Sequence, residues 1–391
     1  WFRNKSGCKI LSMELYNKIS GIDLKRFMYS PEAADDDLMN NWSEVGKMDI
    51  KGKFFPVGHG LTYAFKIGDV SGVNDVHLLY DINRKCDMKE LENFYGNKVI
   101  DYLILSHLHA DHMDGVGKLC KAGFKVKKIY IPYLDNDEKI FVEMRWAFST
   151  GNYRSYQDIV NQFLNLGILE NIENINVVEE QTSFTIGDGL WEFNIFQNKG
   201  NSAAVVNDIR ARLYRKGINS ANIQSMLNNR IGISDIRAVY NASMRKHNFE
   251  LNETSIFLEH GPLIDKIKIV GINGYEFLTR KIRADAGMGA HSLITGDMNL
   301  NEKKNECIIG NYYNKLGVVL VPHHSGVHEW STHVCQNMHV CPNMHLVVWV
   351  VSISEIGIRP YGKVVKDIYD NGQKLYICDK NYSFEYIYRY V

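Results

Sequence analysis

A short segment of the chain holds four potential metal ligands within six residues, namely His107, His109, Asp111 and His112. The segment directly follows the apolar run YLILS, which is typical of a strand. Because side chains of an extended chain alternate, His107 and His109 point the same way, and Asp111 and His112 fall on the turn beyond. Imidazole and carboxylate groups suit Zn, Mn or Fe, and four ligands exceed the need of one ion with an open position. The spacing therefore predicts two divalent metal ions, and we expect Zn or Mn.

Further ligands for a two-metal site are expected where later strands end. Asp297 follows the apolar run HSLI, and His323 and His324 follow GVVLV. Asp297 can bridge two ions through its two carboxylate oxygens, which would let both ions share one hydroxide nucleophile. A histidine-rich surface loop is the alternative for residues 107–112, but the strand before them and Gly115 after them favour a metal site.

The elements that must position these residues follow from the spacing of apolar residues. From Gly52 onward, short runs rich in β-branched and aromatic residues predict strands, and such runs return late in the chain. Helical spacing covers 135–171 and 198–250, which we interpret as helical insertions. Strands on both sides of these helices predict an α+β fold with sheets covered by helices. Residues 1–48 are predicted as an N-terminal helical extension, and residues 49–391 as the domain that carries the site.

The composition narrows the class of protein. The chain has 391 residues, of which 45% are hydrophobic and 23% charged, so it can bury a large core. The longest apolar run, Leu346 to Ile353, is far shorter than the roughly 20 residues that cross a bilayer, which predicts no membrane partner. Seven cysteines without a CxxC pair do not resemble a disulfide framework, which favours a reducing cytoplasm.

Charge offers only a local argument for a polyanionic partner. Lys plus Arg and Asp plus Glu both number 45, so the chain as a whole carries no net charge. Residues 206–250 nevertheless contain eight basic residues against three acidic ones, and five lysines lie between 118 and 128. Either cluster could contact a nucleic-acid backbone, and the alternative is a solvated helix face.

Six segments in order resemble motifs of the metallo-β-lactamase superfamily, and more narrowly its branch of ComEC-type competence nucleases and related soluble, standalone hydrolases. They are FPVGHG at 55–60, LLYD at 78–81, SHLHADHMDG at 106–115, NETSI at 252–256, LITGD at 293–297 and VPHHS at 321–325. The resemblance covers the chain from Gly52 to its end, apart from the insertions. It implies a four-layer αββα sandwich over residues 49–391, a hydrolase domain with metals at one edge between the two sheets.

The resemblance also implies the roles of individual residues. The predicted metal ligands are His107 and His109 on one ion, Asp111 and His112 on the other, Asp297 between them, and His324. We favour His324 over His323 as this last ligand, and His323 would contact the substrate phosphate or donate a proton. The predicted catalytic residues are Asp111, His323 and Arg359, and the predicted substrate-binding residues are Asn252, Ser255 and Ser325. Asp81 is expected to orient a ligand histidine.

Some positions depart from the family pattern. Arg359-Pro360 replaces a late His-Pro, and His59 replaces the glutamine of the opening motif. A guanidinium at position 359 can bind phosphate bidentately, which favours a phosphoester over a neutral ester. Many members of the superfamily carry another metal-binding histidine midway along the chain, and the candidates here are His247 and His260.

We therefore expect a dinuclear metal-dependent phosphodiesterase, and specifically a nuclease in which a hydroxide held between the ions attacks DNA. The alternatives are a hydrolase of a small phosphodiester or ester, such as a cyclic nucleotide, and a non-catalytic binding or scaffold protein. DNA is the expected partner, and residues 1–48 or the insertion are the expected contact for a protein partner. Standalone relatives often act beside other proteins, including in antiphage defence, which extends to this chain only by analogy.

Overall fold

The fold is built from two sheets that share one long strand. The computed structural model describes residues 48–58, 60–69, 75–186, 189–197, 203–219, 222–247, 255–263, 267–278, 289–326, 329–339, 346–353 and 362–390. Strand β10 (Ile267–Leu278) pairs with β15 through its first part and with β14 through its last part, so it belongs to both sheets. A register shift interrupts each pairing, as expected where a strand bends from one sheet into the other.

The first sheet has the strand order β6-β5-β4-β3-β2-β1-β15, followed by β10. Its strands β3 to β6 are parallel neighbours, whereas β1 pairs antiparallel with β2 and β15. The bounds are β1 (Met48–Phe54), β2 (Tyr63–Asp69), β3 (Val76–Tyr80), β4 (Val99–Ile104), β5 (Lys125–Pro132), β6 (Ile175–Val178) and β15 (Phe384–Tyr390).

The second sheet continues from β10 in the order β14-β13-β12-β11-β9-β8-β7. Its strands β11 to β14 are parallel neighbours, and β9, β8 and β7 add an antiparallel end. The bounds are β7 (Gln181–Ile186), β8 (Trp191–Gln197), β9 (Ile256–Pro262), β11 (His291–Ile294), β12 (Leu316–Leu320), β13 (Val348–Ser352) and β14 (Lys374–Cys378).

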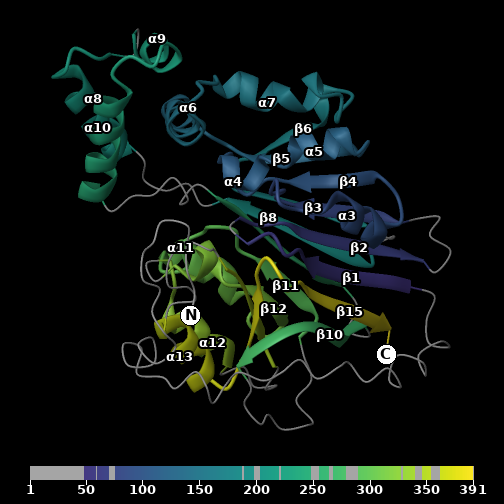
Figure 1. Cartoon of the computed structure of the whole chain (residues 1–391). Coiled ribbons are helices and arrows are strands. Elements are labelled where there is room, and N and C mark those ends of the chain that lie inside the picture. Colours follow the sequence, from purple (N-terminus) through teal and green to yellow (C-terminus); the bar gives the residue numbers. More distant parts are fainter. Residues whose placement is uncertain are drawn as a thin grey trace.

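Three clusters of buried side chains define the layers of the sandwich. One cluster lies between the sheets and includes Tyr63, Trp191 and Tyr386. A second cluster joins the outer face of the first sheet to helices, and a third does the same for the second sheet. The covering helices are α3 (Met88–Tyr95), α5 (Val116–Lys121) and α7 (Tyr156–Asn165) on the first sheet, and α11 (Lys303–Gly310), α12 (Thr332–His339) and α13 (Gly362–Asp370) on the second. This is the αββα sandwich that the sequence predicts (Figure 1).

A helical group stands to one side of this sandwich (Figure 1). It consists of α8 (Ala203–Tyr214), α9 (Ile223–Asn228) and α10 (Ile233–His247), which pack against α6 (Asn136–Thr150) around a fourth apolar cluster. These helices lie within the ranges that the sequence assigns to insertions. The predicted N-terminal extension falls outside the described residues, apart from Met48. Within the described ranges, every helix is too short or too polar to traverse a bilayer.

Candidate metal centre

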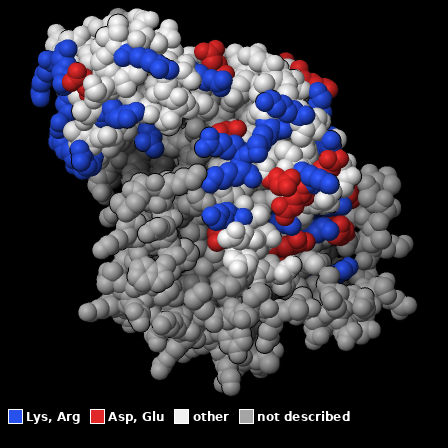
Figure 2. Space-filling view, in the orientation of Figure 1, with Lys and Arg blue, Asp and Glu red and all other residues white. Residues whose placement is uncertain are grey.

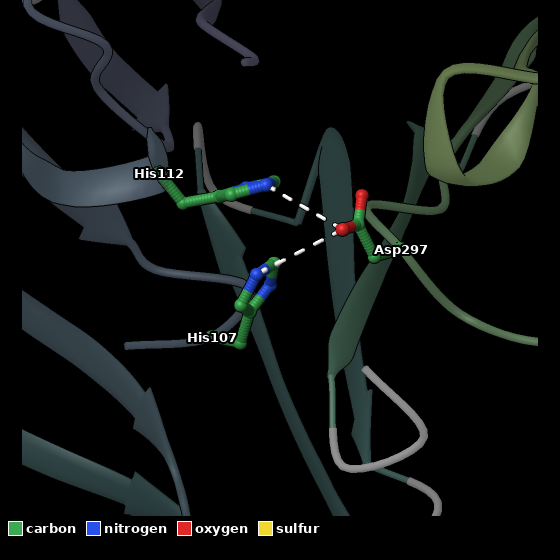
Figure 3. A group of neighbouring side chains, drawn as sticks. All are labelled: His107, His112 and Asp297. Atoms are coloured by element: carbon green, nitrogen blue, oxygen red, sulfur yellow. Dashed lines mark ion pairs between the residues drawn. The ribbon is translucent and has the colours of Figure 1, made fainter. Parts of the chain in front are cut away.

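The predicted ligands come from strand ends that meet between the two sheets. His107 follows β4 of the first sheet, Asp297 follows β11 of the second, and η4 (Pro322–Ser325) follows β12. Because β11 and β12 are parallel neighbours, their carboxyl ends lie at the same edge, where α/β folds commonly place their sites. Helix α4 (Ala110–Met113) carries His112 back toward this edge, and Figure 3 shows His107 and His112 turned toward Asp297.

The ligand atoms of three residues lie close together at this edge. His107 Nε2 lies 3.8 Å and His112 Nε2 lies 3.6 Å from Asp297 Oδ2 (Figure 3). All three ligand atoms lie within 4.8 Å of one another. Around a tetrahedral zinc ion with bonds of about 2.0–2.1 Å, ligand atoms are about 3.4 Å apart. The arrangement is therefore close to that of a bound ion, with two nitrogens and one carboxylate oxygen as donors.

Hydrogen bonds at Nδ1 aim the Nε2 atoms of both histidines into the site. His112 Nδ1 lies 2.7 Å from Asp81 Oδ2, and the Ser106 hydroxyl donates to the same oxygen over 2.7 Å. Ser106 Oγ is then left to accept from His107 Nδ1, 3.0 Å away. These contacts place the ring protons on Nδ1 and leave the Nε2 lone pairs for a metal. Asp81 thus contacts His112, one of the predicted ligands, as expected for a residue that orients a ligand histidine.

The backbone at Asp81 is shaped for this contact. Asp81 has a φ of 54°, a left-handed conformation that is rare outside glycine, and its side chain is completely buried at the end of β3. Its amide donates to Ile104 C=O over 2.8 Å, and its Oδ1 accepts from the Ser106 amide over 2.7 Å. Burial raises the pKa of Asp81 above its usual value, although the neighbouring His112 opposes this shift. A carboxylate held this way couples β3 to residues 107–112, the histidine loop.

Gly296 explains why a glycine precedes Asp297. A Cβ at this position would lie 2.8 Å from the Tyr80 hydroxyl and 2.9 Å from Ser106 Cβ, and the residue has a φ of 54°. Only glycine combines this conformation with so close an approach. The close contact brings Asp297 of the second sheet against the histidine loop of the first.

The two histidines of η4 also face the site. His323, His324 and Ser325 have φ values of 45°, 51° and 67°, three left-handed residues in succession. His323 Nε2 lies 3.9 Å from Asp297 Oδ2, and its Nδ1 lies 2.9 Å from Glu329 Oε1. His324 is buried, its Nδ1 lies 3.2 Å from Ser352 C=O, and its ring centre is 6.3 Å from that of His112. The strained turn thus places His323 Nε2 beside Asp297 and brings the His324 ring near that of His112.

The structure describes the side chains of only some of the remaining predicted residues. His109 is buried with its ring perpendicular to that of His107, at 4.5 Å between centres. Asp111 belongs to α4, but its side chain lies outside the described residues, as do Asn252, Arg359, Pro360 and His59. Ser255, predicted to bind substrate, is buried, and its hydroxyl lies 3.3 Å from His107 Nδ1, so its contact is with a predicted ligand. Buried Ser325 Oγ has no hydrogen bond within the described part of the chain.

Neither midway histidine joins the site. His260 lies in β9 between the sheets, where its Nε2 is 2.8 Å from the Tyr63 hydroxyl and its Nδ1 accepts from Trp191 Nε1 over 3.2 Å. His247 ends α10, with its Nε2 3.6 Å from Asp208 Oδ2. Contacts elsewhere therefore account for both candidates.

Two supporting residues of the site were not predicted. Glu329 lies beside His323, and Trp146 Nε1 donates to Leu108 C=O over 2.8 Å, which fastens α6 to the histidine loop. Trp146 and Leu108 are 38 residues apart in the chain, and Glu329, although close to His323 in sequence, belongs to none of the six motifs, so neither contact was predicted.

The residues present fit a bound metal. Buried His107 Nε2 makes no hydrogen bond to any described residue, although it faces a carboxylate. Burial, followed by the charges of His112 and His109, lowers the pKa of His107 well below its usual range. The ring therefore stays neutral near pH 7, which is the form that binds a metal. A neutral imidazole with its lone pair aimed at a buried carboxylate is expected of a ligand and is costly otherwise.

Comparison with known proteins supports the superfamily that the motifs resemble. Residues 81–214 match the family model of the Metallo-beta-lactamase superfamily, whose members are generally metal-dependent hydrolases. The matched segment includes Asp81 and the histidine loop. No curated protein matches the chain.

Solved structures with similar folds are distant in sequence. The metallo-beta-lactamase fold protein YhfI from Bacillus subtilis has 10% identity and a TM-score of 0.39, over 86% of this chain and 100% of that one. A diphosphatase from the PhnP family has 10% identity and a TM-score of 0.36, over 87% and 100%. A Staphylococcus aureus metallo-beta-lactamase has 12% identity and a TM-score of 0.26, over 75% and 50%. These likenesses are too distant to say what the chain does, so its chemistry must be argued from its own residues.

Proposed function

We propose that this protein is a dinuclear metal-dependent phosphodiesterase that hydrolyses DNA. The observation that carries the proposal is the convergence of the His107 and His112 Nε2 atoms on Asp297, with the Nδ1 atoms fastened by Asp81 and Ser106. The proposed ligands are His107, His109, Asp111, His112, Asp297 and His324. When bound, two divalent ions supply a nucleophile at neutral pH and neutralise charge on the phosphate oxygens.

His323 is the proposed proton donor to the leaving oxygen. The Glu329 carboxylate lies 2.9 Å from His323 Nδ1, so a negative charge stands beside this ring. Its Nε2 then faces the site from the side of Asp297, where a leaving group would need a proton. His323 is also the less buried of the two neighbouring histidines, with a side-chain exposure of 21%, so substrate can reach it.

The phosphate itself needs donors beyond the metals. We assign substrate binding to Arg359, Asn252 and Ser325, and Asp111 to catalysis, on the family pattern. Ser255 is better suited to holding His107, because it is buried against that ring. The substrate is assigned to DNA because basic side chains outnumber acidic ones on the visible face of the helical group α8 to α10 (Figure 2).

Cleavage assays with a matched variant test the proposal. The pure protein is incubated with Mn, Zn or Mg and labelled single- and double-stranded DNA, alongside His107→Ala and the control His333→Ala. His333 is a suitable control because it is exposed on α12, paired with Glu306. We expect metal-dependent cleavage that His107→Ala removes and His333→Ala retains. Absence of cleavage with every metal, or unchanged cleavage in His107→Ala, would refute the proposal.

A second candidate is hydrolysis of a small phosphodiester, such as a cyclic nucleotide. It is favoured by the pairing of the basic residues in the helical group: Arg212 and Lys246 with Asp208, and Lys216 with Asp235. Cations neutralised in this way release fewer counterions from DNA and bind it less tightly. Competition between labelled DNA, cyclic nucleotides and bis(4-nitrophenyl) phosphate separates the two candidates, since the preferred substrate inhibits turnover of the others.

A further inference from the structure

We infer that the helical group binds an aliphatic chain with an anionic headgroup, such as a medium-chain fatty acid, in a pocket between α6, α8 and α9. The pocket has a volume of about 390 Å³, within the range of about 300–1,000 Å³ that is typical of small-molecule sites. None of its described lining residues is a predicted metal ligand. The pocket is therefore distinct from the metal centre.

The floor of the pocket is apolar and belongs to the fourth apolar cluster. Helix α6 contributes Phe141 and Met144, and α8 contributes Val206, Ile209 and Leu213. Because protein interiors are close-packed, they contain few voids larger than a water molecule, and a pocket of this size is too large to be a packing defect. An apolar cavity of about 150 Å³ holds a benzene ring, so this pocket has room for a chain of several methylene groups.

One wall of the pocket is preformed by the turn that ends α8. Gly217 has a φ of 74°, and Ile218 N–H donates to a carbonyl of the last helical turn over 2.9 Å, which folds Ile218 back toward the helix. Asn219 and Asn222 fix the following turn, because the amide of each donates to the side-chain oxygen of the other. Ile218 and Ile223 on either side of this turn therefore line the pocket in fixed positions.

The rim of the pocket is exposed and carries a positive charge. Tyr214 is 76% exposed although it is aromatic, and Arg210 and Ala211 on the same helix are also exposed. The described lining contains one arginine and no carboxylate, so an anionic headgroup complements the charge of the rim. A guanidinium has several N–H donors, so Arg210 can bind a carboxylate and keep another contact. Beside this charge, the Tyr214 ring offers an apolar surface to the chain.

The lining favours an aliphatic chain over a planar ring system. Isoleucine, leucine, valine and methionine make up most of its apolar part. The ring of Phe141 already makes an edge contact with Tyr240, at 6.1 Å between ring centres. Aromatic ligands gain from stacked or edge contacts with other rings, whereas an aliphatic chain gains from burial alone. The pocket therefore suits an aliphatic tail, with the headgroup at Arg210.

Calorimetry with simple amphiphiles tests the inference. Binding of decanoate, octanoate and uncharged decanol to the full chain is measured below the concentrations at which they form micelles or separate from water. We expect one decanoate to bind per chain, about tenfold more tightly than octanoate, because two further methylene groups are buried. Decanol should bind more weakly than decanoate, because it lacks the charge that Arg210 recognises.

Two variants and two matched controls locate the ligand. Ala211→Phe places a bulky ring at an exposed position of the rim, and Arg210→Gln removes the charge. The controls are Asn207→Phe and Arg215→Gln, at exposed positions on α8 and just after it that do not line the pocket. We expect Ala211→Phe to weaken binding of decanoate and decanol more than about tenfold, and Arg210→Gln to weaken only decanoate, by about tenfold.

Both controls should bind decanoate as the wild type does. The inference is overturned if the wild type binds no decanoate, if Ala211→Phe binds it as tightly as Asn207→Phe does, or if Arg210→Gln binds it as tightly as Arg215→Gln does. If Ala211→Phe does not fold, as judged by circular dichroism, the Arg210→Gln comparison and the dependence on chain length decide the question.

Discussion

Two groups of buried histidines in this molecule differ in what their ring nitrogens contact. In the core between the sheets, His260 uses both nitrogens, one toward the Tyr63 hydroxyl and the other accepting from Trp191. At the edge of the sheets, His107 uses only Nδ1 for hydrogen bonds, and its Nε2 faces Asp297 at 3.8 Å. Burial lowers the pKa of both rings. Burial and pKa therefore do not separate a packing histidine from a ligand, whereas the partner of the second nitrogen does.

The largest expected effect comes from removing His107, whose Nε2 faces Asp297 at the edge of the sheets. His107→Ala should lower metal-dependent phosphodiesterase activity by at least about a hundredfold, because the site loses one of its proposed metal ligands. Initial rates at saturating metal measure the loss. His260→Ala should retain its activity per folded molecule. Equal losses of activity in both variants would contradict the distinction between a ligand and a packing histidine.

A smaller effect is expected from the residue that aims His112. Asp81→Asn keeps the shape of the side chain but removes the charge that fixes the His112 Nδ1 proton. Metal affinity should fall by about ten- to hundredfold, as measured by competition with a chelating dye. Asp101→Asn is the control, because Asp101 pairs with Lys127 in the first sheet. Unchanged affinity in Asp81→Asn would mean that the histidine is oriented by other contacts.

The core histidine should instead affect stability. His260→Ala removes the acceptor of Trp191 Nε1 and the partner of the Tyr63 hydroxyl in a fully buried place. The free energy of unfolding should fall by about 2 kcal/mol, as measured by urea denaturation of the metal-free protein. Metal affinity should stay the same. A variant as stable as the wild type would show that these hydrogen bonds contribute little.

The smallest expected effect is a difference in pH dependence. Burial, and then the charge of His291, lowers the pKa of His260 well below its usual range. The unfolded chain therefore binds a proton first, and stability that is complete above about pH 6.5 is lost as the pH falls. Between pH 7.5 and 5.5, the wild type should lose about 1.4 kcal/mol more than His260→Ala. Parallel curves would contradict the lowered pKa.

Much of the fold and half of the site follow from local sequence patterns. The loop 107–112 was predictable because a strand and an alternating ligand pattern adjoin each other, and Asp297 and the His323-His324 pair because each follows a strand. The αββα order followed from the strand runs and the resemblance together. In each case the signal lies within about ten residues.

The rest depends on contacts between distant segments. The Trp146 indole donates to Leu108 C=O, 38 residues away in the chain, and no local pattern marks this pair. Glu329 is close to His323 in sequence but belongs to none of the six motifs. The sequence does not distinguish a packing role of His260 from metal binding, because its hydrogen-bond partners Tyr63 and Trp191 come from other strands. The sequence likewise does not show that Asp208 and Asp235 form ion pairs with basic residues of the helical group, because these pairs depend on how the helices pack.

Metal content is the most direct test of the central claim. Protein purified without chelators and dialysed against metal-free buffer is analysed by mass spectrometry for Zn, Mn and Fe, together with His107→Ala/His112→Ala and with His260→Ala. We expect about two divalent ions per chain in the wild type and in His260→Ala, and a near-complete loss in the double variant. A wild type that neither retains nor takes up metal, or a double variant that holds as much as the wild type, would contradict a metal centre at Asp297.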